Sequence, residues 1–244
     1  AMNRAREMLT SFGMLLAVGC GSKNYEYRIE QTISRKKYEK RLNENLGEAD
    51  KGKLEEKNIF IRPPKGLAGP TKTFQLTAIE PGRFDLENTF IEGDKQSLHV
   101  LARVDQPKAP AKKGAPPQAA APPRGDFNQE VVELIRNASG AEIDLSQFKQ
   151  ETKQVQGRRQ SNTFLAKTLD LSAKEMQIYL FGSKASPYKV ALIFEYPKAQ
   201  KNAVAPKIGL CLENFLVGDP ARLAFSGGET DESGDDGAEA APPI

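Results

Sequence analysis

The sequence predicts an α+β fold, in which a mostly antiparallel sheet is covered by two or more helices and follows a charged N-terminal helix. Short segments with apolar residues at every second position recur between turn signals, which is typical of strands. Two longer segments carry apolar residues three and four apart, which is typical of helices that cover a sheet. The 39% hydrophobic and 27% charged residues are compatible with a folded core and well-solvated flanks.

The first predicted element is a signal sequence over residues 1–19. Arg4 and Arg6 precede an uncharged apolar run, which ends in Leu16-Ala17-Val18-Gly19-Cys20. A basic start, a short apolar run and small residues at a cleavage site indicate export. As a helix the twelve residues 8–19 would extend about 18 Å, too short for a hydrocarbon core of about 30 Å. We therefore expect no permanent membrane span here.

The ending at Cys20 resembles the lipobox of bacterial lipoproteins, in which the signal is cut before the cysteine and the thiol receives a diacylglycerol. That family usually has Leu three places before the cysteine, where this sequence has Ala17. The resemblance covers only residues 1–20 and implies lipidation of Cys20 and a place on a bacterial membrane. Gly21, in place of Asp, fits the outer membrane, facing the periplasm or the cell surface. The alternatives are an ordinary cleaved signal and a cytoplasmic protein with a buried apolar N-terminus.

Residues 20–53 are expected to form a lipid-anchored tether with a charged helix at 25–46, followed by a polar loop over 47–57. Tyr25, Ile29 and Ile33 are spaced four apart. The helix either packs one stripe on the domain or rests its basic side chains on anionic headgroups or a partner. Each basic residue near such a surface adds about 1 kcal/mol. The expected contact residues are Arg28, Arg35, Lys36, Lys37, Lys40 and Arg41.

Residues 54–218 are expected to form a single domain. Strand 188–196 is apolar on both faces and should be central, in a hairpin with the strand before it. The segment 106–125 is rich in Pro and Ala and should be an inserted loop. The predicted strands are 59–62, 73–79, 97–104, 163–171, 176–181 and 188–196.

Two helices are predicted to cover the sheet. The first, 126–138, begins at the N-cap residue Asp126. The second, 204–217, has Pro206 in its first turn, although a strand across 208–213 is an alternative.

Residues 219–244 are expected to be a disordered acidic tail. No Lys or Arg follows Arg222, and the residues after Arg222 include six acidic ones. Setting those six acids aside, 35 basic residues face 26 acidic ones in the remaining chain.

The sequence predicts no catalytic residue, no metal site and no cofactor. The single histidine, His99, excludes metal sites that need several histidines and is expected to be half-exposed on its strand. Cys211 lies in an apolar segment and should be a buried structural thiol. Two Ser-x-x-Lys spacings lack the companion motifs of penicillin-binding enzymes, and two close acid pairs are interpreted as surface acids. These four features are Ser146/Lys149, Ser186/Lys189, Asp85/Glu87 and Glu142/Asp144.

These observations favour a membrane-anchored envelope lipoprotein that acts as a non-enzymatic binding or structural module. Its expected partners are the membrane, through the lipid on Cys20, and an envelope protein or polymer. Nucleic acid is not expected, because the short basic runs lack clustered aromatic residues. The alternative is an exported hydrolase with a pocket of acidic side chains whose pKa values are raised. The order of strands and helices loosely resembles the PsbP-like α/β sandwich, which implies a fold and no function.

Overall fold

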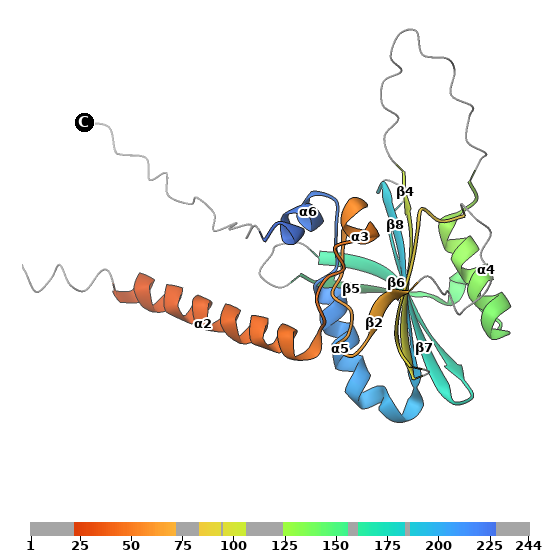
Figure 1. Ribbon diagram of the computed structural model, residues 1–244, viewed down its shortest axis with the longest axis horizontal. Coiled ribbons are helices and arrows are strands. Elements are labelled where there is room, and N and C mark those ends of the chain that lie inside the picture. Colours follow the sequence, from red (N-terminus) through yellow and green to blue (C-terminus); the bar gives the residue numbers. More distant parts are fainter. Residues whose placement is uncertain are drawn as a thin grey trace, which may run out of the picture. The chain divides into compact units, whose positions relative to one another are not determined.

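The computed structural model describes residues 22–71, 83–93, 95–105, 124–155, 161–183 and 186–227. The chain divides into two compact units, residues 1–44 and 45–244. The first unit contains most of α2 (Ser22–Asn45), the charged helix predicted from the sequence. The second unit contains the sheet and the other described helices (Figure 1).

Several predicted features lie outside the described residues. They are the signal sequence with Cys20, the strand at 73–79, most of the segment 106–125 and most of the acidic tail. Each of them stays a prediction.

The main sheet has seven described strands, all paired antiparallel, which confirms the predicted fold class. The strand order is β2-β3-β4-β8-β7-β6-β5, so β8 is central, as its two apolar faces predict. β4 precedes the segment 106–123 and β8 follows it, yet the two strands pair along their lengths. The strands are β2 (Ala68–Thr71), β3 (Leu86–Glu92), β4 (Gln96–Val104), β5 (Lys149–Gln154), β6 (Ser161–Leu171), β7 (Lys174–Phe181) and β8 (Tyr188–Pro197).

The sequence did not predict β2, β3 or β5. In β3 the polar residues Asn88 and Thr89 are buried together with Leu86 and Phe90, so the apolar alternation is hidden. β5 contains no apolar residue, and its strand conformation comes with its pairing to β6. Strand formation in these segments depends on neighbours that are distant in the sequence.

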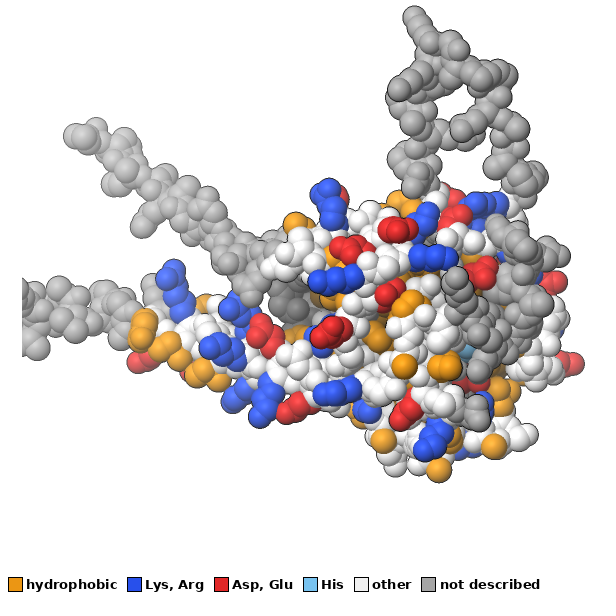
Figure 2. All heavy atoms as spheres, viewed as in Figure 1, with side chains coloured by type: hydrophobic (Ala, Val, Ile, Leu, Met, Phe, Trp, Pro, Cys, Tyr) orange, Lys and Arg blue, Asp and Glu red, His pale blue; other side chains and the backbone are white. Residues whose placement is uncertain are grey.

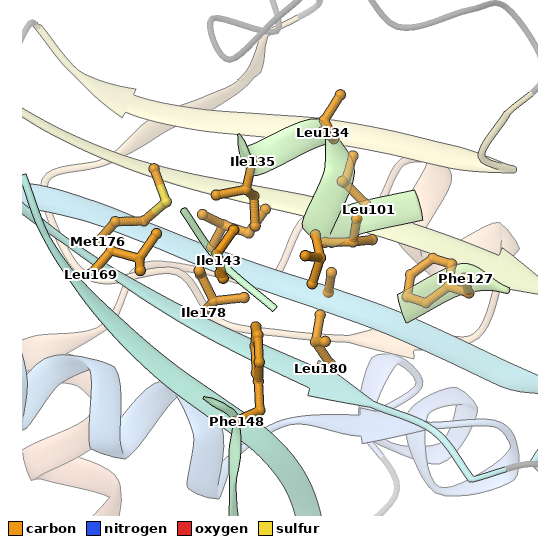
Figure 3. Close-up of a cluster of buried hydrophobic side chains, with 14 of the residues drawn as sticks. Leu101, Phe127, Leu134, Ile135, Ile143, Phe148, Leu169, Met176, Ile178 and Leu180 are labelled. Atoms are coloured by element: carbon orange, nitrogen blue, oxygen red, sulfur yellow. The ribbon is translucent and has the colours of Figure 1, made fainter. Parts of the chain in front are cut away.

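α4 (Phe127–Ser139) covers one face of the sheet (Figure 1). The Asp126 carboxylate accepts a hydrogen bond from the Gln129 backbone N–H at 3.0 Å, which confirms the predicted N-cap. Gly140 ends the helix with φ of 67°, a left-handed conformation that glycine adopts readily. The apolar stripe of α4 packs into a buried cluster with side chains of β4, β7 and β8 (Figure 3), among them Leu101, Ile178, Leu180 and Ile193.

α5 (Lys201–Glu213) lies on the opposite side of the sheet (Figure 1), so the alternative strand at 208–213 is wrong. The helix starts earlier than predicted because the 3-10 turn η2 (Lys198–Gln200) leads directly into it. Pro206 is therefore inside the helix and not in its first turn. It lacks an N–H and cannot bond to the carbonyl of Asn202.

A two-stranded sheet of β1 (Ile59–Phe60) and β9 (Leu216–Val217) completes the second unit. It packs with two short helices, α3 (Lys53–Glu56) and α6 (Asp219–Phe225). α3 replaces part of the loop predicted over 47–57, and α6 replaces the first residues of the tail predicted from 219. Both are too short to show a period in the sequence. The Phe60 and Phe225 rings hold this corner together, with centroids 5.0 Å apart.

Candidate functional sites

The predicted lipidation residue, Cys20, lies outside the described residues, so its modification stays a prediction. Within the described chain, no helix combines the length and the apolar character needed to cross a bilayer.

The six predicted contact residues all lie on α2, and all are exposed. The helix does not gather them on one face. At about 100° per residue, Lys36 and Lys40 point in nearly the same direction, whereas Arg28 and Arg35 point about 80–140° away from these lysines. Figure 2 shows hydrophobic side chains gathered over the N-terminal half of this helix.

His99 on β4 is the centre of a buried polar cluster in the second unit. It is only 1% exposed, so the prediction of half exposure is wrong. The reason is that β4 lies inside the sheet, between β3 and β8, where helices cover the sheet. The Nε2 of His99 is 3.0 Å from Ser97 Oγ, and its Nδ1 is 3.1 Å from Thr89 Oγ1. Glu195 Oε1 lies 3.9 Å from Nε2.

The environment of His99 keeps its ring neutral at pH 7. Burial lowers the pKa of His99 from 6.5 to about 4, and the charge of Lys174 adds to this effect. A neutral imidazole donates one hydrogen bond and accepts one, so the two hydroxyls satisfy it. In a catalytic triad a carboxylate would orient the second ring nitrogen. Here the hydroxyl of Thr89 has that place, so the contacts fit a satisfied core histidine.

Among the described residues, the two acids whose pKa values are raised are not adjacent. Burial raises the pKa of Glu87 and that of Glu195, against the opposing effect of nearby lysines. In the sheet, Glu87 of β3 lies opposite Leu101 of β4, and Leu101 lies opposite Ala191 of β8. Glu87 and Glu195 are thus about 10 Å apart across the strands and about 14 Å along them. Paired acids in glycosidases are separated by about 5–10 Å.

One acid of each pair noted in the sequence has a structural role. Asp85 forms a bidentate pair with Arg124 at 2.9 and 3.0 Å. Burial alone would raise the pKa of Asp85, but the hydrogen bonds from Arg124 and from the Val104 N–H outweigh burial and lower it. Asp144 is exposed and accepts from the Ser146 N–H at 2.8 Å, which caps the 3-10 turn η1 (Leu145–Gln147). These acids stabilise local structure.

Arg103 is a buried charge that the sequence analysis missed. It is 4% exposed, and its guanidinium donates to Glu130 Oε2 at 2.7 Å and to the Gly125 carbonyl at 2.8 Å. Arg83 also donates to Glu130 Oε2, at 3.3 Å. The network joins β4 to the first turn of α4. A charged residue in a mostly buried strand that also carries Leu98, Val100 and Leu101 was the available signal, because a buried charge needs a partner.

A second network, with Glu175 and Tyr196 buried and Lys201 exposed, joins β7 and β8 to the start of α5. The Tyr196 hydroxyl, which is fully buried, donates to Glu175 Oε1 at 2.5 Å, and Lys201 Nζ donates to Glu175 Oε2 at 2.8 Å. Burial would raise the pKa of Glu175, but the hydrogen bonds from Lys201, Tyr196 and Gln177 outweigh it and lower the pKa. Glu175 is therefore held ionised inside a satisfied network.

The remaining nucleophile candidates are also in structural surroundings. Cys211 is fully buried, which confirms the predicted burial of this thiol, and burial raises the pKa of the thiol. The Ser186 hydroxyl bonds to the backbone of Tyr188, while Lys189 pairs with Asp105 at 3.7 Å. Among the residues that the structure describes, no group of three or more His, Cys, Asp or Glu side chains could hold a metal ion.

Comparison with known proteins gives only weak likenesses of structure. No family model matches the chain, and no curated protein matches it. Cyanobacterial PsbP (CyanoP) from Synechocystis sp. PCC 6803 is 12% identical over 71% of this chain and 93% of its own, with a TM-score of 0.40. The Ran-binding protein Mog1p of Saccharomyces cerevisiae is 12% identical over 72% of this chain and 98% of its own, with a TM-score of 0.38. The expected PsbP-like resemblance is present in this weak form and assigns no function.

Proposed function

We propose that this chain is a membrane-anchored lipoprotein of the bacterial envelope that acts as a non-enzymatic binding or structural module. A lipid on Cys20 holds it at a membrane, outside the cytoplasm. α2 connects that anchor to the folded unit, and the folded unit contacts another envelope protein or polymer.

The order of elements along the chain carries this proposal. The lipobox-like Leu16-Ala17-Val18-Gly19-Cys20 ends two residues before Ser22, where α2 begins. The 24 residues of α2 extend about 36 Å, and the second compact unit begins at Asn45. An anchor, a connecting helix and a folded unit thus follow one another directly, as a tethered module requires. Several acyl chains on one cysteine would hold the protein firmly, because each buried methylene adds about 0.8 kcal/mol.

The internal bonding of the second unit supports a non-enzymatic role. Within the part of the chain that the structure describes, the polar centres considered for chemistry are His99, Glu130 with Arg103, and Glu175 with Tyr196. Each is bonded to neighbouring strands or helices. Among the described acids, those whose pKa values are raised, Glu87 and Glu195, lie in different strands. We therefore favour the module over the hydrolase.

Metabolic labelling of the full-length protein with radioactive palmitate tests the anchor. Cys20→Ala should abolish the label and release the protein from membranes into the soluble fraction. Cys211→Ala, which removes the buried thiol, should keep both the label and the membrane association. Label that persists in Cys20→Ala, or a mature protein that still carries residues 1–19, would show that the proposal is wrong.

A further inference from the structure

One face of α2 combines exposed apolar side chains with lysines. Tyr25, Ile29 and Ile33 follow one another at four-residue intervals, and all three are exposed. At about 100° per residue, Tyr25 and Ile33 point within about 40° of the direction of Ile29. Lys36 and Lys40 continue the same line in the second half of the helix, within about 20° of that direction. We call these five residues the α2 stripe.

The acidic residues of α2 lie outside the stripe. Glu26 and Glu44 point about 60° from Ile29, and Glu30 and Glu39 point about 80–100° away from it. None of the five stripe residues is acidic, although α2 as a whole contains both signs and Glu44 pairs with Lys40 at 3.9 Å. Its apolar half is also the half nearer to Cys20 in the sequence.

We propose that the α2 stripe lies along an anionic phospholipid surface, so that α2 runs parallel to the membrane and does not project from it. The proposal rests on the proposed anchoring, since the surface is the leaflet that would hold the lipid on Cys20. Exposed apolar side chains and lysines each favour contact with an anionic phospholipid surface, the first through burial at the interface and the second through attraction to headgroups. Tyr25 is suited to the headgroup level because its ring is amphipathic.

The spacing of the apolar residues favours the parallel orientation. Ile33 is eleven residues beyond Ser22, which is about 16 Å along the helix. In an upright helix only the first turns would reach the interface, and Ile33, Lys36 and Lys40 would remain far from it. In a parallel helix all five stripe residues reach it together. The apolar residues occupy only the first half of α2. The second half therefore needs the attraction between its two lysines, Lys36 and Lys40, and the anionic headgroups to stay at the surface.

Tryptophan fluorescence tests this orientation, because the native chain contains no Trp. Three variants each carry one reporter: Tyr25→Trp and Ile33→Trp on the stripe, and Tyr27→Trp as the matched control. Tyr27 points about 160° from Ile29, and it is 61% exposed compared with 67% for Tyr25. The chain from residue 20 onward is coupled through the Cys20 thiol to a maleimide lipid in vesicles. The buried thiol of Cys211 should not react.

On vesicles of phosphatidylglycerol and phosphatidylcholine in equal parts, the reporters at positions 25 and 33 should shift to the blue and be quenched by brominated lipid. The reporter at position 27 should change little. An unchanged reporter at position 33 would show an upright helix, and equal changes at 27 and 33 would show that no face is selected. Equal signals on phosphatidylcholine alone would show that anionic lipid is not required. Each of these three outcomes overturns the proposal.

A charge-matched pair of variants, made in the Ile33→Trp background, tests the role of the lysines. Lys36→Gln with Lys40→Gln should weaken docking of α2 about 25-fold, or about 5-fold per lysine. Arg28→Gln with Arg35→Gln removes the same charge away from the stripe and should weaken it less than 3-fold. The double lysine substitution also removes the exposed ion pair between Lys40 and Glu44 at 3.9 Å. The double arginine substitution likewise removes the exposed ion pair between Arg35 and Glu39 at 3.8 Å. Equal losses in the two pairs would refute a stripe-specific contact.

The two proposals can fail separately. The maleimide lipid supplies the tether, so the fluorescence result does not depend on whether cells lipidate Cys20. Palmitate labelling reports on that modification alone. Loss of label with docking intact would overturn the proposed function, whereas retained label with an undocked helix would overturn only the orientation.

Discussion

The Arg103–Glu130 pair offers the sharpest test of how the second unit is held together. Glu130→Gln keeps the shape of the side chain and removes the charge that faces Arg103 at 2.7 Å. Arg103 would then be a buried cation without a carboxylate, and among the described residues its Nε already has no hydrogen-bond partner. The substitution should therefore cost more than the loss of an ordinary hydrogen bond.

The structure sets the expected size of this effect. Breaking a fully buried ion pair from one side costs about 3–5 kcal/mol. The Arg103 side chain is 5% exposed, but that of Glu130 is 18% exposed, so the lower end of this range applies. We expect Glu130→Gln to lower the free energy of unfolding by about 3 kcal/mol. For a domain of about 200 residues that corresponds to a drop in Tm of about 6–12 °C.

Glu133→Gln is the matched control, because it makes the same chemical change one turn along α4. Glu133 pairs with Arg83 at 3.0 Å, but its side chain is 59% exposed, so its loss should cost less than about 1 kcal/mol. Urea unfolding followed by circular dichroism measures both variants. Equal losses for Glu130→Gln and Glu133→Gln would refute the reasoning from burial. Replacing Arg103 and Glu130 together by Met should recover much of the stability, since no unpaired charge remains.

Two further predictions concern His99 and two glycines. His99 is neutral in the folded chain down to about pH 4, whereas in the unfolded chain it takes up a proton near pH 6.5. Its contribution to the free energy of unfolding is therefore fully present above pH 6.5. As the pH falls from 6.5 toward 4, the free energy of unfolding should decrease by up to about 3 kcal/mol. NMR titration of this single histidine checks it directly, and a midpoint near 6.5 would contradict the buried assignment. Gly182→Ala should destabilise the fold by more than about 1 kcal/mol, because φ there is +125° and a Cβ would lie 2.6 Å from the Tyr188 carbonyl oxygen. Gly209→Ala, inside α5 with open space around it, should instead stabilise the fold by up to about 1 kcal/mol, and urea unfolding that gives both variants the same sign would contradict the local geometry.

The elements that could be predicted from the sequence are those whose own residues show a period. α4 has both an apolar stripe and a capping aspartate, and β8 is apolar on both faces, so its central place followed. β5 has no apolar residue, and α3 and α6 are too short for any period. Their conformations depend on partners far away in the sequence, which a local pattern does not contain.

The candidate sites also divide into those that a local sequence pattern predicts and those that depend on residues far away in the sequence. The sequence predicts lipidation of Cys20 and contact through the basic residues of α2, because both signals are local and linear, and both stay predictions. His99 was expected to be half-exposed, and its burial between Ser97, Thr89 and Glu195 follows from pairing among β3, β4 and β8. Alternation along one strand shows which residues share a face. It does not show whether the other face is also covered, because that depends on the neighbouring layers.

The sequence alone therefore determined the α+β class, the central strand β8, the main covering helices and the charged N-terminal helix, through hydrophobic periods of two and of about 3.6 residues. Only the tertiary structure decided which polar residues are buried and with which partners, as for Arg103 with Glu130 and Glu175 with Tyr196. The physical reason is that a buried charge is stable only beside its counterpart. That counterpart is brought into place by the packing of elements that are separated in the sequence.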